Sequence, residues 1–115
     1  MSSSSQAIRE LPEFVQKQAQ QALHQFLNHR PNAVQLDGNL HRSAIVVYEV
    51  TPHPLTREQV RLPIGLLNWR DNRWRLYFRG TRGRWVAYPD TPSVQRPDPL
   101  LDCIAQDELG IFWRQ

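Results

Sequence analysis

The residues that could do chemistry concentrate in one stretch of this chain, NRWRLYFRGTRGRWVAY, at positions 72–88. Arginines are interleaved there with tryptophan, tyrosine and phenylalanine. A guanidinium group forms forked hydrogen bonds with carboxylate or phosphate and also stacks on aromatic rings. The stretch therefore predicts an anion-binding surface, provided that the arginines share one face of the structure.

Other candidate groups give weaker signals. Glu49 interrupts the apolar run IVVYEV, so its carboxylate is either paired with an arginine or poised for catalysis, and we favour the structural pair. The four histidines, His24, His29, His41 and His53, show no metal-ligand spacing, and we expect neither a metal nor a cofactor. Cys103 has no histidine partner in sequence, which favours a small buried hydrophobe over a nucleophile.

Two turns decide where the arginines of this stretch point. A two-residue turn at Asp71-Asn72 pairs Arg70 with Arg73, and a four-residue loop over 80–83 pairs Arg79 with Arg84. Because side chains alternate across a strand, one face becomes a core face. That core face holds Leu67, Trp69, Trp74, Leu76, Phe78, Trp85 and Ala87. The predicted binding residues on the opposite face are Arg70, Arg73, Arg75, Tyr77, Arg79, Arg84 and Tyr88.

The remaining elements must support this sheet. Apolar residues at three- and four-residue steps from Leu11 to Leu27, Phe14 among them, predict a long amphipathic helix that ends at Pro31. AVQL and SAIVVYEV, separated by Asp37-Gly38-Asn39, predict two strands, the second covered on both faces. A strand follows at about 60–69, with Pro63 at an edge or bulge. A short helix is expected over 98–109, with Asp98 as its N-cap, after which Phe112 and Trp113 pack back on the sheet.

These elements predict an α+β fold, with one twisted antiparallel sheet of four or five strands and both helices packed on it. The 115 residues suit a single domain over 7–115 behind a disordered Ser-rich tail at 1–6. A single cysteine excludes an internal disulfide, and no apolar run approaches the ~20 residues of a membrane span. We expect a cytoplasmic monomer or homodimer with no membrane partner.

The residues WRLYFRGTRGRWVAYP resemble an uncharacterised bacterial family, domain of unknown function 3024, whose pattern is W-x-L-Y-W, a short turn, K-W-H-x-Y and proline. Trp74, Leu76, Tyr77, Trp85, Tyr88 and Pro89 match this pattern in identity and spacing. Phe78 replaces a tryptophan, Arg84 a lysine and Val86 a histidine, while Thr51 replaces the arginine of an upstream E-x-R-P segment. Three of the matching residues, Trp74, Leu76 and Trp85, are assigned to the core, and the polar positions differ, so the resemblance supports the fold and implies no activity.

The charge pattern leaves several functions open. Net charge is +3, and of the fourteen basic residues only Lys17 is a lysine. We expect a small non-enzymatic binding module that uses its Arg/Tyr-rich face to engage an acidic protein partner. The alternatives are a nucleic-acid-binding protein that uses the same face, and an enzyme centred on Glu49. The face is otherwise a plain solvated surface, or its arginines form intramolecular salt bridges with acids such as Glu49, Glu58 and Asp71.

Overall fold

The computed structural model describes residues 11–28, 35–107 and 110–112. The described helices are α2 (Glu13–Asn28) and α3 (Asp98–Gln106), with a 3-10 turn η1 (Thr81–Gly83). The strands are β1 (Leu36–His41), β2 (Ala44–Pro52), β3 (Gln59–Arg70), β4 (Arg73–Arg79) and β5 (Trp85–Ala87). The expected tail at 1–6 and Trp113 lie outside the described residues.

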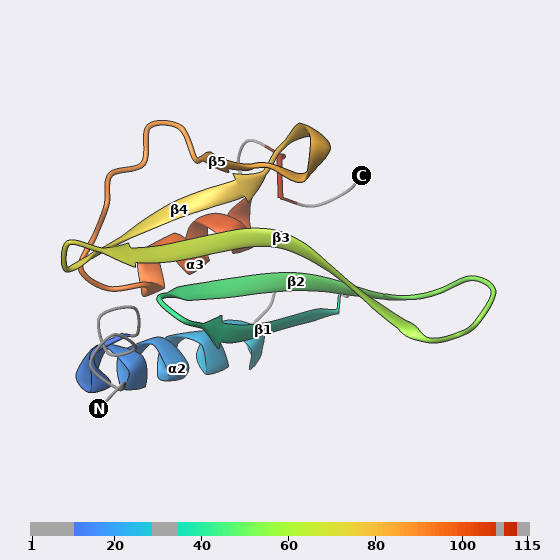
Figure 1. Ribbon diagram of the computed structural model, residues 1–115, viewed down its shortest axis with the longest axis horizontal. Helices are drawn as coiled ribbons and strands as arrows, with labels where there is room; N and C mark the ends of the chain where they lie inside the picture. Colours follow the sequence, from blue (N-terminus) through green and yellow to red (C-terminus); the bar gives the residue numbers. More distant parts are fainter. Residues whose placement is uncertain (1–10, 29–34, 108–109, 113–115) are drawn as a thin grey trace, which may run out of the picture.

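The strands form one antiparallel meander in the order β1-β2-β3-β4-β5. Both helices lie on the same side of this sheet, α2 beside β1 and α3 behind β3 and β4 (Figure 1). The predicted α+β class, with one antiparallel sheet and two packed helices, is confirmed. Because both described helices cover one face, neither of them lies over the other face of the sheet.

Helix α2 buries the stripe expected from its periodicity, with Val15, Ala19, Ala22, Leu23 and Phe26 inside. Phe14 is an exception, because it lies one position outside the stripe and is 71% exposed. The helix approaches β1 closely at Gly38, where an added Cβ would lie 2.7 Å from Cδ1 of Leu23. A larger residue there would require the Leu23 side chain to move away from the strand.

Helix α3 packs over β3 in the same way. A Cβ on Gly65 would lie 2.7 Å from Cδ1 of Ile104, a fully buried residue of α3. The helix is shorter than predicted, because Asp107 adopts a left-handed conformation that ends it after Gln106. The predicted N-cap, Asp98, lies inside the helix, and Pro97 occupies the cap position. Phe112 is buried at 3% exposure, as expected.

The turn between β1 and β2 lies later than predicted. Asp37, Gly38 and Asn39 belong to β1, and the chain reverses at Arg42-Ser43, where Arg42 has a φ of 57°. The prediction failed because Asp-Gly-Asn is a sequence typical of turns, whereas this glycine lies within the strand, where it allows the close approach of Leu23. The expectation that the second strand is covered on both faces is also wrong, since β2 alternates between the helix side and the uncovered side.

Strand β3 contains the predicted irregularity at Pro63. The register against β2 shifts between Val47, which pairs with Gly65, and Tyr48, which pairs with Pro63, so Ile64 is the extra residue of a bulge. Beyond the bulge β2 and β3 continue as a long hairpin that projects from the body (Figure 1). The bulge therefore separates a sheet-forming half of β3 from this projecting arm.

Candidate functional site

The hairpin between β3 and β4 is built as the sequence predicts. Asp71 and Asn72 form a two-residue turn, with φ values of 55° and 63° that fit a type I′ turn. The register pairs Arg70 with Arg73 and Trp69 with Trp74. Trp74 is fully buried and its ring centre lies 5.2 Å from that of Trp69, so these two indoles belong to the helix side. The arginines of the hairpin therefore point to the uncovered side.

Strand β5 is shifted by one residue from its predicted register. The loop before it holds five residues, 80–84, because the 3-10 turn adds a left-handed residue, Arg82, with a φ of 64°. The N–H of Gly80 donates to the carbonyl of Arg84 at 2.6 Å and closes this loop. Arg79 consequently pairs with Trp85, where we predicted Arg84.

The shift exchanges the two faces of β5, because neighbouring side chains point in opposite directions. Trp85 lies on the uncovered side, where the guanidinium carbon of Arg79 is 5.8 Å from its ring centre. Ala87 is exposed on the same side. The prediction that both residues join the core is wrong.

Two predicted binding residues leave the uncovered side for the same reason. Tyr88 stacks on Phe112 with 5.2 Å between ring centres, and it packs against the core. Arg84 ends the loop and has no cross-strand partner in β4. Of the seven predicted residues, the uncovered side keeps Arg70, Arg73, Arg75, Tyr77 and Arg79.

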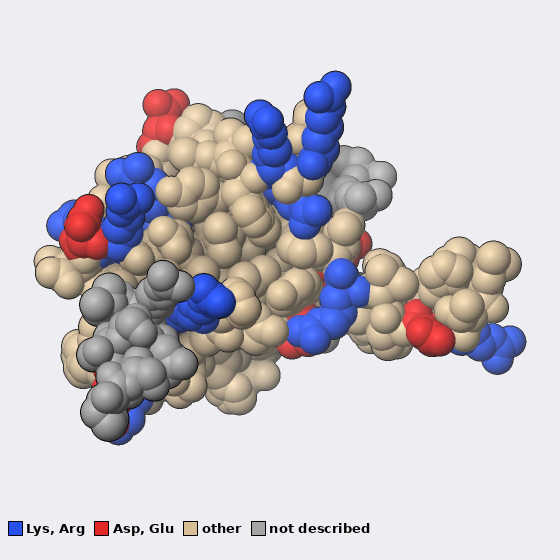
Figure 2. Space-filling view, in the orientation of Figure 1, with Lys and Arg blue, Asp and Glu red and all other residues tan. Residues whose placement is uncertain are grey.

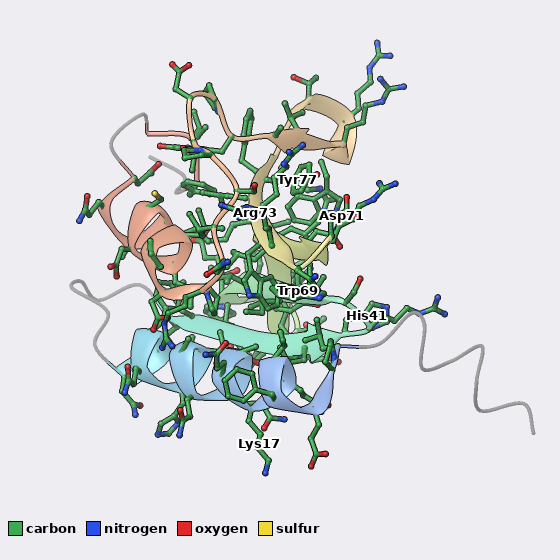
Figure 3. The ribbon with its side chains drawn as sticks, turned by 90° about the vertical axis from the view of Figure 1, so that its left-hand side faces the viewer. Lys17, His41, Trp69, Asp71, Arg73 and Tyr77 are labelled. Atoms are coloured by element: carbon green, nitrogen blue, oxygen red, sulfur yellow. The ribbon has the colours of Figure 1, made fainter. Side chains whose placement is uncertain are left out.

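We call this uncovered side the open face and define it by the strand residues that alternate away from the helices. Its polar and charged members are Asp37, Asn39, His41, Arg61, Asn68, Arg70, Arg73, Arg75 and Arg79, and its apolar and aromatic members are Ala44, Val46, Tyr48, Val50, Pro63, Leu66, Tyr77, Trp85 and Ala87. Arg73 and Tyr77 project from β4 on the side opposite α3 (Figure 3).

The centre of the open face is apolar. Val46 pairs with Leu66 and Leu66 pairs with Tyr77, so these half-buried residues form one row across β2, β3 and β4. Basic side chains gather at opposite ends of the face and leave a largely uncharged region between them (Figure 2). Along β4, Arg75 and Arg79 stand two residues before and after Tyr77, about 7 Å away on either side.

The arginines of β3 and β4 in this region lack acidic partners. In the described part of the chain, Arg70, Arg75 and Arg79 form no ion pair and no side-chain hydrogen bond. The salt bridges that the plain-surface alternative offered, with acids such as Asp71 and Glu58, are not formed by these three arginines among the described residues. Uncompensated guanidinium groups remain available to an external anion.

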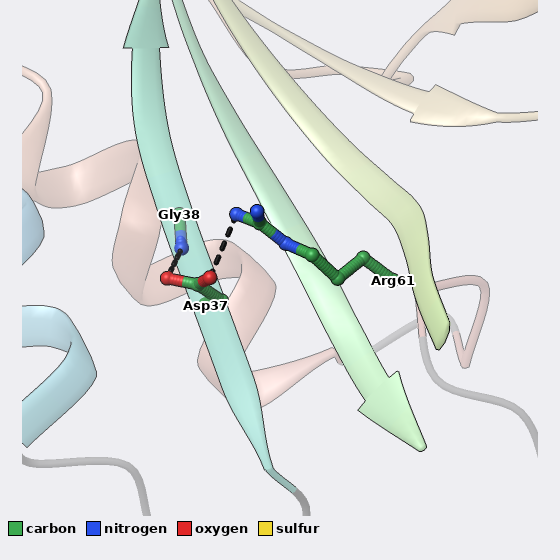
Figure 4. A network of polar contacts seen from close by, with 3 residues as sticks. All are labelled: Asp37, Gly38 and Arg61. Carbon is green, nitrogen blue, oxygen red and sulfur yellow. Dashed lines mark hydrogen bonds and ion pairs between the residues drawn. The ribbon is translucent and has the colours of Figure 1, made fainter. Parts of the chain in front are cut away.

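Arg61 is different, because the structure gives it a partner. Its Nη2 lies 2.7 Å from Oδ2 of Asp37 on β1, and its guanidinium carbon lies 4.6 Å from the ring centre of Tyr48 (Figure 4). Asp37 also accepts a hydrogen bond from the N–H of Gly38 at 2.7 Å. Both charged side chains are 45% exposed, so this pair orders the rim of the open face and contributes little to stability.

Arg73 is held by hydrogen bonds to a neutral residue. Its Nε donates to Oγ of Ser93 at 3.1 Å and its Nη2 donates to the carbonyl of Ser93 at 3.2 Å. Ser93 belongs to the segment between β5 and α3, which returns to β4 where Val94 pairs with Trp74. Sequence reasoning missed this contact, because nothing local links residues twenty positions apart.

Glu49 faces the helix side, between Leu36 of β1 and Leu62 of β3. Its Oε1 is buried and has no hydrogen-bond partner, and the described residues contain no ion pair between Glu49 and an arginine. The favoured prediction of a structural Glu–Arg pair is therefore wrong. The apolar neighbours explain this, because both adjacent strands place leucine beside the carboxylate.

Among residues 11–28, 35–107 and 110–112, no three His, Cys, Asp or Glu side chains lie close enough to hold a metal ion. Neither described helix has the length and hydropathy required to span a bilayer.

An antiparallel sheet with the two described helices on one face and an arginine-rich open face defines a small α+β domain. Residues 8–114 match the family described as Domain of unknown function (DUF3024). The chain belongs to this family, as the resemblance of its WRLYFRGTRGRWVAYP segment implied. No curated protein and no solved structure matches the chain.

Proposed function

We propose that this protein is a non-enzymatic binding module whose open face engages an acidic protein partner. The observation that carries the proposal is the set of unpaired arginines, Arg70, Arg75 and Arg79, around an apolar row. Protein interfaces combine an apolar centre with a polar rim, and they are enriched in arginine, tyrosine and tryptophan. Acidic groups on the partner would meet the arginines while its apolar side chains cover Leu66 and Tyr77.

Single-stranded nucleic acid is the second candidate, and the placement of Trp85 favours it. Trp85 and Tyr77 offer ring faces beside Arg79, and stacking on aromatic residues with phosphate contacts from arginine is a general mode of single-strand binding. The apolar row favours the protein partner, because Val46 and Leu66 offer no ring to a base.

An enzyme centred on Glu49 is the third alternative. It requires a histidine within hydrogen-bond reach of the carboxylate in a concave site. Among the described residues no histidine donates to Glu49, whose Oε1 has no partner. This geometry gives the third alternative no support.

The test compares three forms of the full chain. The charge-reversed variant carries Arg75→Glu and Arg79→Glu. The control carries Lys17→Glu, on the outer side of α2, and Arg57→Glu, in the turn of the projecting arm. Each double substitution removes two positive charges and adds two negative ones, which takes the net charge from +3 to −1.

Each form is immobilised, exposed to nuclease-treated lysate of the source organism, and washed. We expect acidic proteins retained by the wild type and the control to be lost from the charge-reversed variant. A retained protein is then purified and its affinity for all three forms is measured. Equal binding by the charge-reversed variant and the control would overturn the proposal, and so would binding that requires nucleic acid.

A further inference from the structure

A hollow of about 410 Å³ lies at one end of the open face, where the β3–β4 hairpin meets the returning segment. Arg70, Arg73 and Arg75 line it. Asn68 and Tyr77, which carry an amide and a hydroxyl, line the same space. Donor residues from two strands therefore line one volume, which is large enough for a small oxyanion.

The geometry of the hollow is partly fixed before any ligand binds. Ser93 holds the Nε and Nη2 atoms of Arg73 at 3.1 and 3.2 Å, which orients that guanidinium group. Oδ1 of Asn68 accepts a hydrogen bond from Oγ of Ser43 at 3.4 Å, so its amide nitrogen remains available as a donor. An oriented donor loses less conformational freedom on binding than a free one.

The charge of the lining suits a dianion. Three arginines face one acid, Asp71, so the lining carries a net charge of two positive units (three minus one). In the described chain neither Asp71 nor the three arginines take part in an ion pair. Nothing within the hollow therefore neutralises this excess.

We infer that the hollow binds a phosphate monoester carried on a serine or threonine side chain of the acidic partner, an inference that rests on the proposed function. A phosphorylated side chain carries about −1.5 to −2 charges at pH 7 and three strong acceptor oxygens, which matches the excess charge and the number of donors. A carboxylate or a nucleic-acid phosphodiester carries a single charge and would leave one positive unit uncompensated. Arginine clusters are a recurring means of recognising phosphorylated segments.

Each lining residue then has a definite role. The guanidinium groups of Arg70, on β3, and Arg75, on β4, donate hydrogen bonds to the phosphoryl oxygens. Arg73, oriented by Ser93, donates a further hydrogen bond to the same group. Asn68 and Tyr77 donate neutral hydrogen bonds. Asp71 lies in the hairpin turn, and its carboxylate repels the bound anion, which lowers the affinity of the hollow for phosphate.

The experiment titrates the purified full chain with three matched synthetic peptides and follows binding by calorimetry and by the Arg Nε–Hε signals in NMR spectra. The peptides are alike except at one position, which holds phosphoserine, glutamate or serine. Inorganic phosphate and a short oligothymidylate are titrated in parallel. The variants are Arg73→Ala, Arg73→Lys, Asp71→Asn and the control Arg57→Ala, which removes one positive charge far from the hollow.

We expect the phosphoserine peptide to bind at least about tenfold more tightly than the glutamate peptide, with inorganic phosphate competing for the same signals. Arg73→Ala should weaken phosphopeptide binding by about tenfold or more, and Arg73→Lys should restore only part of it because the fork is lost. Asp71→Asn should tighten binding severalfold, and Arg57→Ala should leave it unchanged.

Equal affinity for the phosphoserine and glutamate peptides would overturn the inference, as would equal losses in Arg73→Ala and Arg57→Ala. Oligothymidylate binding that is stronger than phosphopeptide binding and lost in Arg73→Ala would assign the hollow to nucleic acid instead. These outcomes are separate from the test of the proposed function. An acidic partner lost from the charge-reversed variant but insensitive to phosphatase would leave the binding module standing without its phosphate site.

Discussion

The guanidinium carbon of Arg79 lies 5.8 Å from the ring centre of Trp85, its cross-strand partner on the open face. Trp85, which was predicted to lie in the core, is therefore part of the open face, beside its arginines. This contact also fixes the direction of every side chain in β5. The stability of variants at two tryptophans tests this placement directly.

Trp85→Ala should lower the free energy of unfolding by about 1 kcal/mol or less, because its ring is only half-buried on an uncovered face. Trp74→Ala is the matched comparison. Trp74 is fully buried against the helices, and its removal should cost about 3–5 kcal/mol. Urea unfolding of both variants measures the difference, and similar losses at the two sites would place Trp85 in the core after all.

Gly65 and Ile104 should be energetically coupled. Gly65→Ala places a Cβ 2.7 Å from Cδ1 of Ile104, so we expect a loss of about 1–3 kcal/mol from overpacking. Ile104→Val removes that Cδ1 and should cost about 0.5–1.5 kcal/mol alone. In the double variant the clash is absent, so the combined loss should be smaller than the sum of the two single losses. Additive losses in a double-mutant cycle would show that α3 does not press on β3 at this point.

Glu49→Leu should stabilise the protein by about 1–3 kcal/mol. The carboxylate has a buried oxygen without a donor and lies between two leucines, so replacing it removes a desolvation penalty and adds apolar contact. Chemical unfolding at neutral pH measures the change. A loss of stability would instead show that Glu49 has a stabilising partner in solution.

The features predicted correctly from the sequence are those that depend only on residues close together in the chain. The amphipathic stripe of α2 needs only its own periodicity, and Asp71-Asn72 allows a single register because a two-residue turn leaves no freedom. The length of the loop over 80–84 was mispredicted. Arg82 adopts the left-handed conformation that glycine favours, and this adds one residue to the loop that the sequence pattern does not indicate. A one-residue change in register moves every side chain of a strand to the opposite face of the sheet. This single error therefore placed Trp85, Arg84 and Tyr88 on the wrong faces.

Two other features of the candidate site depend on contacts between distant residues. Ser93 reaches Arg73 only because Val94 pairs with Trp74, and Asp37 reaches Arg61 across β2. The environment of Glu49 depends on Leu36 and Leu62, which the sheet brings together from either side. Such contacts follow from topology and register, which sequence periodicity alone does not determine.

The most direct test of the account is an NMR titration of the 15N-labelled chain with a synthetic glutamate-rich peptide, with the charge-reversed Arg75→Glu/Arg79→Glu variant and the Lys17→Glu/Arg57→Glu control in parallel. We predict that shifts concentrate on open-face residues of β2 to β5, including Leu66, Tyr77 and the indole of Trp85, and that they vanish only in the charge-reversed variant. Shifts centred on the outer surfaces of α2 and α3, or shifts that survive in the charge-reversed variant, would contradict the claim that the open face is the binding surface.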